Sequence, residues 1–231
     1  MTLHTPPLLL DLFSGAGGAA MGYSRAGFRV VGVDHVRQPH YPFEFILADA
    51  MTFPLEGWDA IHASPPCQAF TAMRTMANSR QHDDLLGPTL ARLDTWGGPY
   101  VVENVMGAPM RSAVRLCGTT FGLGSEVPGR GPVDLHRHRL FEVNWPLMVP
   151  PCAHRRGRMV VGFYGDHARI RRRSSEGGDI IGPAEKMRLV KEAMGIEWMT
   201  WAEANQAIPP AYTEYVGRAL MAEVLRRVAA A

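Results

Sequence analysis

The chain has 231 residues and a mass of 25.4 kDa, which is the size of one globular domain, so we expect a single domain over residues 1–231. Hydrophobic residues at 46% and charged residues at 20% exclude a disordered, collagen-like or coiled-coil chain. No window reaches the roughly 20 apolar residues of a bilayer span, and no basic stretch precedes the first apolar run. We therefore expect a soluble, cytoplasmic protein without a membrane partner.

The charges nearly cancel, with 24 Lys and Arg against 22 Asp and Glu, so no field of the whole molecule requires a nucleic-acid partner. One segment is strongly polarised, because residues 155–173 contain seven arginines and one acid, Asp166. Cys67, Cys117 and Cys152 are an odd number of widely spaced cysteines, which favours free thiols over a disulfide framework.

Short runs rich in Val, Ile and Leu alternate with helix-like segments in the first half of the chain. Such runs are typical of parallel strands buried on both faces, and we expect a doubly wound α/β fold with a mostly parallel sheet. The predicted strands are residues 8–13, 29–34, 45–48, 58–63 and 100–105. The predicted helices are residues 18–26, 82–96, 184–194 and about 210–228, the last beginning at Pro209-Pro210.

The second half gives weaker signals. Residues 122–131 are rich in Gly and Pro and are predicted to be a loop, and strand-like pieces follow at 140–143 and 159–164. No internal repeat and no low-complexity tract is found.

A glycine-rich turn, Asp11-Leu-Phe-Ser-Gly-Ala-Gly-Gly18, joins the first predicted strand to the first helix. Nucleotides bind at this position in α/β sheets, and Asp34 at the end of the second strand is placed to accept hydrogen bonds from ribose hydroxyls. The spacing Gly15-x-Gly17-x-x-Ala20 also satisfies the dinucleotide fingerprint. The turn alone therefore does not separate nicotinamide binding from adenosylmethionine binding.

Two further segments end strands at the same sheet edge. Ser64-Pro-Pro-Cys67-Gln68 follows the fourth strand, and its prolines stiffen the backbone that carries the thiol. Glu103-Asn104-Val105 ends the fifth strand among apolar neighbours that favour burial and a raised pKa of Glu103, as an acid catalyst needs. The plainer alternatives are an inert, buried cysteine and a solvated or salt-bridged glutamate.

In this order, the motifs resemble those of the DNA (cytosine-5) methyltransferases. The glycine turn resembles the family's cofactor loop, Pro66-Cys67-Gln68 its nucleophile motif, and Glu103-Asn104-Val105 its Glu-Asn-Val motif. Two more matches lie downstream: Arg137-His-Arg139-Leu-Phe141 resembles the Arg-x-Arg motif, and Gln206-Ala-Ile-Pro-Pro210 resembles the carboxy-terminal motif. The resemblance implies a compact member with a Rossmann-like methyltransferase fold.

The resemblance also implies S-adenosyl-L-methionine as cofactor and DNA as partner. Phe13 would pack on the adenine, Asp34 would bind the ribose and Asp49 would lie near the adenine amino group. The remaining implied cofactor residues are Ser14, Gly15, Ala16, Gly17, Gly18, His35, Ala50, Pro66, Gln206 and Ala207.

For the substrate, the resemblance implies that Cys67 attacks carbon six of a cytosine and that Glu103 interacts with ring nitrogen three. Arg139 would hold the base with support from Arg137, while Gln68 and Asn104 complete the substrate side. Such chemistry has a physical basis, because carbon five of cytosine is a poor nucleophile until a thiolate adds to the neighbouring carbon. The target base of a duplex must also leave the stack.

Three positions depart from the family pattern: Ser64 replaces a glycine, Leu135 a glutamine and Gln206 an asparagine. The recognition-like segment, residues 142–182, has only 41 residues. Its arginines are expected to contact phosphates or guanine edges, although charged runs also commonly face water. They are Arg155, Arg156, Arg158, Arg171, Arg172 and Arg173.

Other readings remain open. A free pyrimidine nucleotide is an alternative substrate, and a catalytically weak DNA- or partner-binding module is an alternative of another class. An amino-methyltransferase needs an aromatic ring where Cys67 stands, and a nicotinamide oxidoreductase leaves Cys67-Gln68 unexplained. The sequence does not decide between a homo-oligomer, a separate recognition partner and neither, nor a role in restriction or protection.

A zinc site is a further alternative. His136, His138, Cys152 and His154 suggest it, but their spacing matches no finger pattern, and alternate histidines in a strand more often serve packing. We therefore expect no metal.

Overall fold

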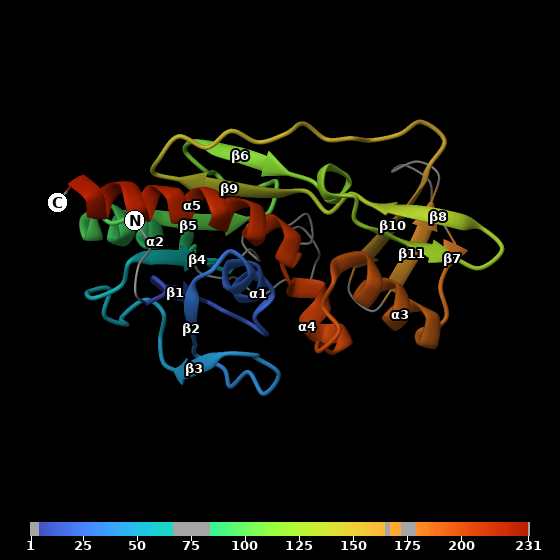
Figure 1. The fold of residues 1–231 in the computed structure, drawn as a ribbon. Coiled ribbons are helices and arrows are strands. Elements are labelled where there is room, and N and C mark those ends of the chain that lie inside the picture. The colour runs from blue at the N-terminus through green and yellow to red at the C-terminus, as the bar shows by residue number, and fades with distance from the viewer. Residues whose placement is uncertain (1–4, 67–83, 165–166, 172–178, 231) are drawn as a thin grey trace.

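The computed structural model describes residues 5–66, 84–164, 167–171 and 179–230 (Figure 1). The strands are β1 (Leu8–Leu12), β2 (Arg29–Asp34), β3 (Glu44–Leu47), β4 (Ala60–Ala63), β5 (Tyr100–Asn104), β6 (Ala113–Leu116), β7 (Gly124–Val127), β8 (Gly131–Leu135), β9 (Arg139–Val143), β10 (Met159–Tyr164), β11 (His167–Arg171) and β12 (Asp179–Ile180). The helices are α1 (Gly18–Arg25), α2 (Leu86–Trp96), α3 (Pro183–Met194), α4 (Trp201–Gln206), α5 (Pro210–Ala230) and the short 3-10 helix η3 (Gly118–Phe121).

The larger sheet has seven strands in the order β3-β2-β1-β4-β5-β9-β6. The first five are parallel to one another, whereas β9 runs antiparallel to both β5 and β6. The chain order reverses between β1 and β4, which is where open α/β sheets bind ligands at the carboxyl ends of their strands. The predicted doubly wound α/β fold is confirmed, and the predicted strands and helices are present with small shifts of their ends.

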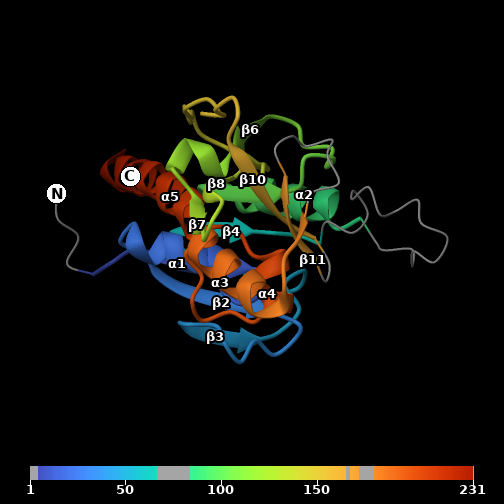
Figure 2. The same ribbon diagram turned by 90° about the vertical axis from the view of Figure 1, so that its right-hand side faces the viewer.

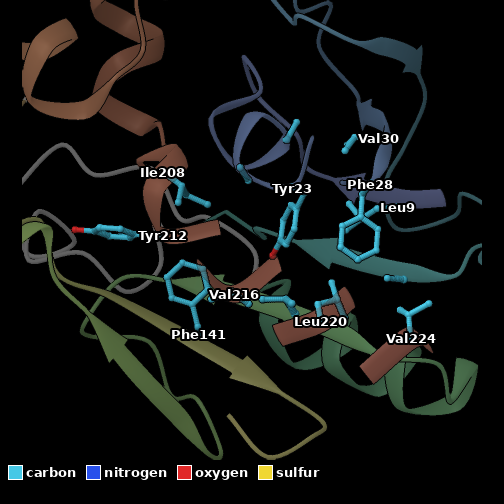
Figure 3. Packing of buried hydrophobic residues seen from close by; sticks show 14 of the residues in the cluster. Leu9, Tyr23, Phe28, Val30, Phe141, Ile208, Tyr212, Val216, Leu220 and Val224 are labelled. Carbon is cyan, nitrogen blue, oxygen red and sulfur yellow. The ribbon is translucent and has the colours of Figure 1, made fainter. Parts of the chain in front are cut away.

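Side-chain alternation along the strands supplies both faces of this sheet with apolar groups. Leu9 packs in a cluster with residues of α1 and α5, whereas Leu10 and Leu12 pack in a second cluster with residues of α2. Figure 3 shows the first cluster, where Tyr23 and Phe28 meet the side chains of α5. Because both faces are covered by helices, the strands read as continuous apolar runs rather than as alternating ones.

Glycines allow α1 and α5 to approach closely. A Cβ atom on Gly22 would collide with the side chain and backbone of α5 around Thr213, and one on Gly217 would lie 2.8 Å from the Cβ of Ala26. The Thr213 hydroxyl donates to the Ala19 carbonyl at 2.9 Å. The two helices therefore form one layer that fixes the end of the chain over the first strands.

A second sheet, with strand order β12-β11-β10-β8-β7, lies beyond one end of the first (Figure 1). Seen from that end, this sheet lies with α3 and α4 in front of the larger sheet (Figure 2). Its own apolar cluster joins the strands to α3 and includes Val133, Leu135, Phe163 and Leu189. The recognition-like segment, residues 142–182, supplies β10, β11 and β12 to this sheet, while β7 and β8 precede that segment in the chain.

The prediction of a loop over residues 122–131 is wrong in part, because β7 and the start of β8 form an antiparallel hairpin there. Gly129 and Gly131 adopt positive φ angles of 71° and 82° at the turn. Gly124 leaves room for the backbone of Val133 on the partner strand, where a Cβ atom would collide. Glycine content here therefore reflects a tight turn and close strand pairing rather than a loop.

Among the described residues, none of the helices combines the length and the apolar character required to cross a membrane.

Candidate active site at the carboxyl edge of the parallel sheet

The glycine turn leaves β1 in a conformation that few side chains tolerate. Phe13, Gly15 and Gly17 have φ angles of 56°, 49° and 83°. The Gly15 amide donates to Oδ2 of Asp34 at 3.0 Å, which ties the turn to the end of β2. A Cβ atom on Gly15 would have no atom within 4 Å, so this part of the backbone faces open space where a ligand can approach. Ala16, by contrast, is buried and belongs to the apolar cluster of the second sheet.

Asp34 is the anchor of the β2 side of the site. Besides Gly15, its carboxylate accepts the Val36 amide at 2.9 Å, and His35, which is exposed, lies 3.3 Å from the same oxygen. The residue is only 8% exposed, but Oδ2, which accepts the Gly15 amide, has a second acceptor position left for a ligand hydroxyl. Sequence reasoning predicted this carboxylate and did not foresee that it also holds the turn.

Two buried oxygens beneath the turn lack a protein donor. Oδ1 of Asp11 and Oγ of Ser14 have no hydrogen-bond partner within the part of the chain that the structure describes. Tyr41 donates to the other oxygen of Asp11 at 3.4 Å, and burial raises the pKa of Asp11 well above its usual value. Buried polar atoms are normally paired, so these two are available to a ligand with donor groups.

Asp49 and Ala50 follow β3 at the same edge. Asp49 is exposed and accepts the Met51 amide at 2.8 Å, whereas Ala50 is buried. The guanidinium of Arg92 in α2 donates to the carbonyls of Ala50, at 2.6 Å, and of Phe53. This arginine, which sequence reasoning missed, therefore holds the Asp49-Ala50 turn in place.

The carboxy-terminal motif closes over the glycine turn. A Cβ atom on Gly18 would lie 2.5 Å from the Ile208 carbonyl and 3.4 Å from the Cβ of Ala207, so only glycine allows this contact. The indole of Trp198 donates to the Ala16 carbonyl at 2.8 Å. Ala207 is half-buried at this junction, while the side chain of Gln206 is exposed.

The guanidinium of Arg137 is directed at the end of α4. It donates to the carbonyls of Asn205 at 2.6 Å and of Ala207 at 2.9 and 3.1 Å, with a longer contact to Ala204 at 3.4 Å. These carbonyls end a helix that begins with a capping box between Thr200 and Glu203. Arg137 therefore holds the carboxy-terminal motif, in addition to its proximity to Glu103.

Glu103 and Arg139 form a buried ion pair, with Nε of Arg139 3.0 Å from Oε1 of Glu103. Their side chains are only 8% and 17% exposed. Burial raises the pKa of Glu103, although Arg139, Arg137 and a hydrogen bond from Ser64 act in the opposite direction. The predicted burial and raised pKa of Glu103 are confirmed. Its pairing with Arg139, for which the resemblance implied a contact with the target base, was not predicted.

A series of hydrogen-bonded side chains leads from Tyr23 to Glu103. The Tyr23 hydroxyl lies 2.9 Å from Nδ1 of His62, and Nε2 of His62 lies 2.7 Å from the Ser64 hydroxyl. Burial lowers the pKa of His62 to about 3, so the imidazole is neutral, with one nitrogen accepting and the other donating. If Tyr23 donates to Nδ1, then Nε2–H of His62 donates to the Ser64 hydroxyl, and Ser64 donates to the Glu103 carboxyl group.

Asn104, which sequence reasoning grouped with the DNA contacts, is 1% exposed and donates to the Pro65 carbonyl at 3.0 Å. It therefore links the end of β5 to the Pro65-Pro66 turn that leads toward the nucleophile motif. Pro66 is half-buried at the last described position of this turn. Cys67 and Gln68 lie outside the described residues.

The arginines of the recognition-like segment that the structure describes do not form one group. Arg155 and Arg156 are exposed, whereas Arg158 is paired with Asp134 at 3.1 Å and Arg171 is half-buried at the end of β11. Arg172 and Arg173 fall outside the described residues. Leu135, which departs from the family pattern, is 1% exposed in the core of the second sheet.

No protein-family model and no curated protein matches this sequence. Among solved structures, the chain is similar to the Dnmt2 methyltransferase of S. pombe, with 12% identity, a TM-score of 0.54, and coverage of 94% of this chain and 99% of that one.

Weaker matches include a prophage-encoded DNA modification methyltransferase of E. coli, with 18% identity, a TM-score of 0.41, and coverage of 59% of this chain and 46% of that one. A DNMT2 mutant of Spodoptera frugiperda matches at 20% identity, with a TM-score of 0.37 and coverage of 61% and 52%. The matched region thus spans about half the length of these two proteins. At such identities the likeness concerns the fold alone, and the chain has the Rossmann-like fold of the S-adenosylmethionine-dependent methyltransferases.

Proposed function

We propose that this protein transfers a methyl group from S-adenosyl-L-methionine to carbon five of cytosine in DNA, through a covalent adduct with Cys67. The observation that carries the proposal is the Glu103–Arg139 pair, which lies at the same sheet edge as the glycine turn and the Pro65-Pro66 turn. A buried carboxyl group with a raised pKa and a fixed guanidinium are the groups that recognition of an everted cytosine requires.

The residues present fit the proposed cofactor. The open backbone at Gly15 admits a ligand, Asp34 has an acceptor position for a ribose hydroxyl, and the orphan hydroxyl of Ser14 lies in the turn itself. Phe13 would pack on the adenine and Asp49 would lie at its edge. When bound, S-adenosylmethionine supplies an electrophilic methyl group on a sulfonium.

Each protein group has a defined task in the proposed reaction. The Cys67 thiolate adds to carbon six, while Glu103, supplied with a hydrogen bond by Ser64, donates a proton or hydrogen bond to ring nitrogen three. Carbon five gains nucleophilic character from this addition and would take the methyl group as the bond to the sulfonium sulfur breaks and S-adenosylhomocysteine leaves. A base then removes the proton from carbon five, Glu103 recovers any proton it gave to ring nitrogen three, the bond between Cys67 and carbon six breaks, and Cys67 returns as thiolate.

Arg139 positions Glu103 and would also contact the target base. The ion pair, with Nε of Arg139 3.0 Å from Oε1 of Glu103, orients the guanidinium before the base arrives. Such pre-orientation lowers the barrier without a new contact in the transition state.

DNA is favoured over a free nucleotide because Arg155 and Arg156 are exposed on the connector between β9 and β10, beside the segment that carries Arg139. Exposed arginines can contact several phosphates along a DNA backbone, whereas a free nucleotide presents the phosphate of only one residue. A free pyrimidine nucleotide stays the alternative substrate in the test.

The test incubates the protein with methyl-labelled S-adenosylmethionine and either duplex DNA, single-stranded DNA or dCMP, followed by digestion and identification of the labelled nucleoside. The proposal predicts 5-methylcytosine from DNA with the wild type, and a loss of about 100-fold or more in Cys67→Ser and Glu103→Gln. Label in dCMP alone would favour a free pyrimidine nucleotide as the substrate. Label on an exocyclic nitrogen would overturn the proposed mechanism.

A further inference from the structure

Two cysteines and two histidines from three separate segments meet outside the candidate active site. Cys117 follows β6 and caps η3, His138 precedes β9, and Cys152 and His154 lie on the connector between β9 and β10. One donor atom from each of the four residues lies within 4.8 Å of every other. Cys117 and Cys152 are free thiols.

Two sulfur–nitrogen distances in this cluster are close to the edges of a metal-centred tetrahedron. Sγ of Cys117 lies 3.2 Å from Nε2 of His154, and Sγ of Cys152 lies 3.4 Å from Nε2 of His138. Zinc bonds of about 2.3 Å to sulfur and 2.0 Å to nitrogen give sulfur–nitrogen edges of roughly 3.5 Å in a tetrahedron. With all four donor atoms within 4.8 Å of one another, the four side chains can close around one ion.

Neighbouring groups hold the ligands in these positions. The His136 ring stacks on the His154 ring at a centroid distance of 3.9 Å and an interplanar angle of 4°. The Thr119 hydroxyl lies 3.1 Å from Sγ of Cys117 and accepts the Ala153 amide at 3.2 Å, which links the two cysteine-bearing segments. Support of this kind around the ligands orients side chains in structural metal sites.

We propose that Cys117, His138, Cys152 and His154 bind one structural Zn²⁺ ion. Two thiolates and two neutral imidazoles in tetrahedral arrangement are the donor set that zinc prefers, and four protein ligands leave no position for a substrate. The ion stabilises the fold by fixing the long connector, which in Figure 1 runs from the end of β9 back to the second sheet.

The same ion would position the catalytic arginine. His138 stands between Arg137, which holds the carboxy-terminal motif, and Arg139, which is paired with Glu103. A metal bond at His138 therefore restrains the backbone from which both guanidinium groups extend. This consequence for catalysis rests on the proposed function, whereas zinc binding itself does not.

The test measures zinc by elemental analysis after purification without added metal and after incubation with ZnSO₄ followed by desalting. The wild type is expected to hold about one zinc per chain, and Cys152→Ser and His154→Ala are each expected to lose most of it. His40→Ala, which removes an exposed histidine paired with Glu203, is the matched control and should keep the full amount. Cys67→Ser should also keep its zinc while losing methyl transfer, so that failure of one proposal is distinguishable from failure of the other.

Cobalt replacement provides a readout that folding defects alone do not imitate. Co²⁺ bound to the wild type should show the intense visible bands of a tetrahedral site and the near-ultraviolet sulfur-to-cobalt band, and both should disappear in Cys152→Ser. Chelation should lower the Tm of the wild type by roughly 5 °C or more and leave that of His154→Ala unchanged. Zinc below about 0.1 per chain after reconstitution, or a Cys117–Cys152 disulfide in the freshly purified protein, would overturn the proposal.

Discussion

Replacing Arg137 with alanine tests how the carboxy-terminal motif is held against the glycine turn. The guanidinium donates to three carbonyls at the end of α4, two of them at 2.6 and 2.9 Å. Hydrogen bonds from a charged group contribute about 1.5–3 kcal/mol each, and water replaces part of them at this half-exposed helix end. We expect a loss of about 3 kcal/mol, which for a chain of this length lowers Tm by roughly 6–12 °C.

The same substitution should weaken cofactor binding, because the Ile208 backbone lies against Gly18 in the turn. A tenfold rise in the Kd of S-adenosylmethionine, measured by calorimetry, corresponds to about 1.4 kcal/mol of lost interaction. Arg139→Ala is the matched control, since it should reduce methyl transfer and leave this Kd within about twofold. An Arg137→Ala protein that melts within about 1 °C of the wild type and binds the cofactor equally well would refute the clamp.

Three further predictions concern one buried acid, one buried histidine and the glycine turn. Because the pKa of Glu103 is raised in the folded protein, the stability contributed by its protonated form is lost as pH rises through that pKa. In parallel melts, the Tm of Glu103→Gln minus the Tm of the wild type should therefore increase between pH 4 and pH 8. His62 has its pKa lowered to about 3, so stability present above about pH 6.5 should fall by about 1.4 kcal/mol for each pH unit below it, and His62→Gln should show a shallower acid loss in urea unfolding. Gly15→Ala and Gly57→Ala both place alanine at positive φ with no atom within 4 Å, but only Gly15→Ala should raise the Kd of S-adenosylmethionine, by about tenfold; an equal effect in both would mean backbone strain rather than ligand contact.

The sequence predicts the position of those site residues that lie at the ends of parallel strands. Apolar runs predicted the parallel strands, and the carboxyl ends of parallel strands share an edge, so Asp34 and Glu103 were predicted at one edge. The apolar neighbours of Glu103, which are Val101, Val102 and Val105, also predicted its burial, and Glu103 is buried. These inferences need only local patterns and the geometry of a parallel sheet.

The remaining contacts depend on tertiary packing that no local pattern reports. Arg137 itself has a φ angle of 21°, and its side chain extends toward α4. Its acceptors there are backbone carbonyls, which are present in every sequence and give no local signal. Cys117 lies 21 positions before His138, so the spacing on which the expectation of no metal rested did not include Cys117, one of the four residues of the proposed zinc site. His62 did carry a signal, because a histidine inside the apolar strand β4 needs buried partners, and Ser64 two positions on lies on the same side.

The most direct test of the central claim is the intact mass of the complex formed with S-adenosylmethionine and DNA that contains 5-fluorocytosine. Fluorine at carbon five is not lost as a proton would be, so the bond between sulfur and carbon six persists. The account predicts a covalent species with the mass of protein, DNA and one methyl group, with the link mapped to Cys67 and absent from Cys67→Ser. Methyl transfer by Cys67→Ser at the wild-type rate, or a link at another residue, would contradict it.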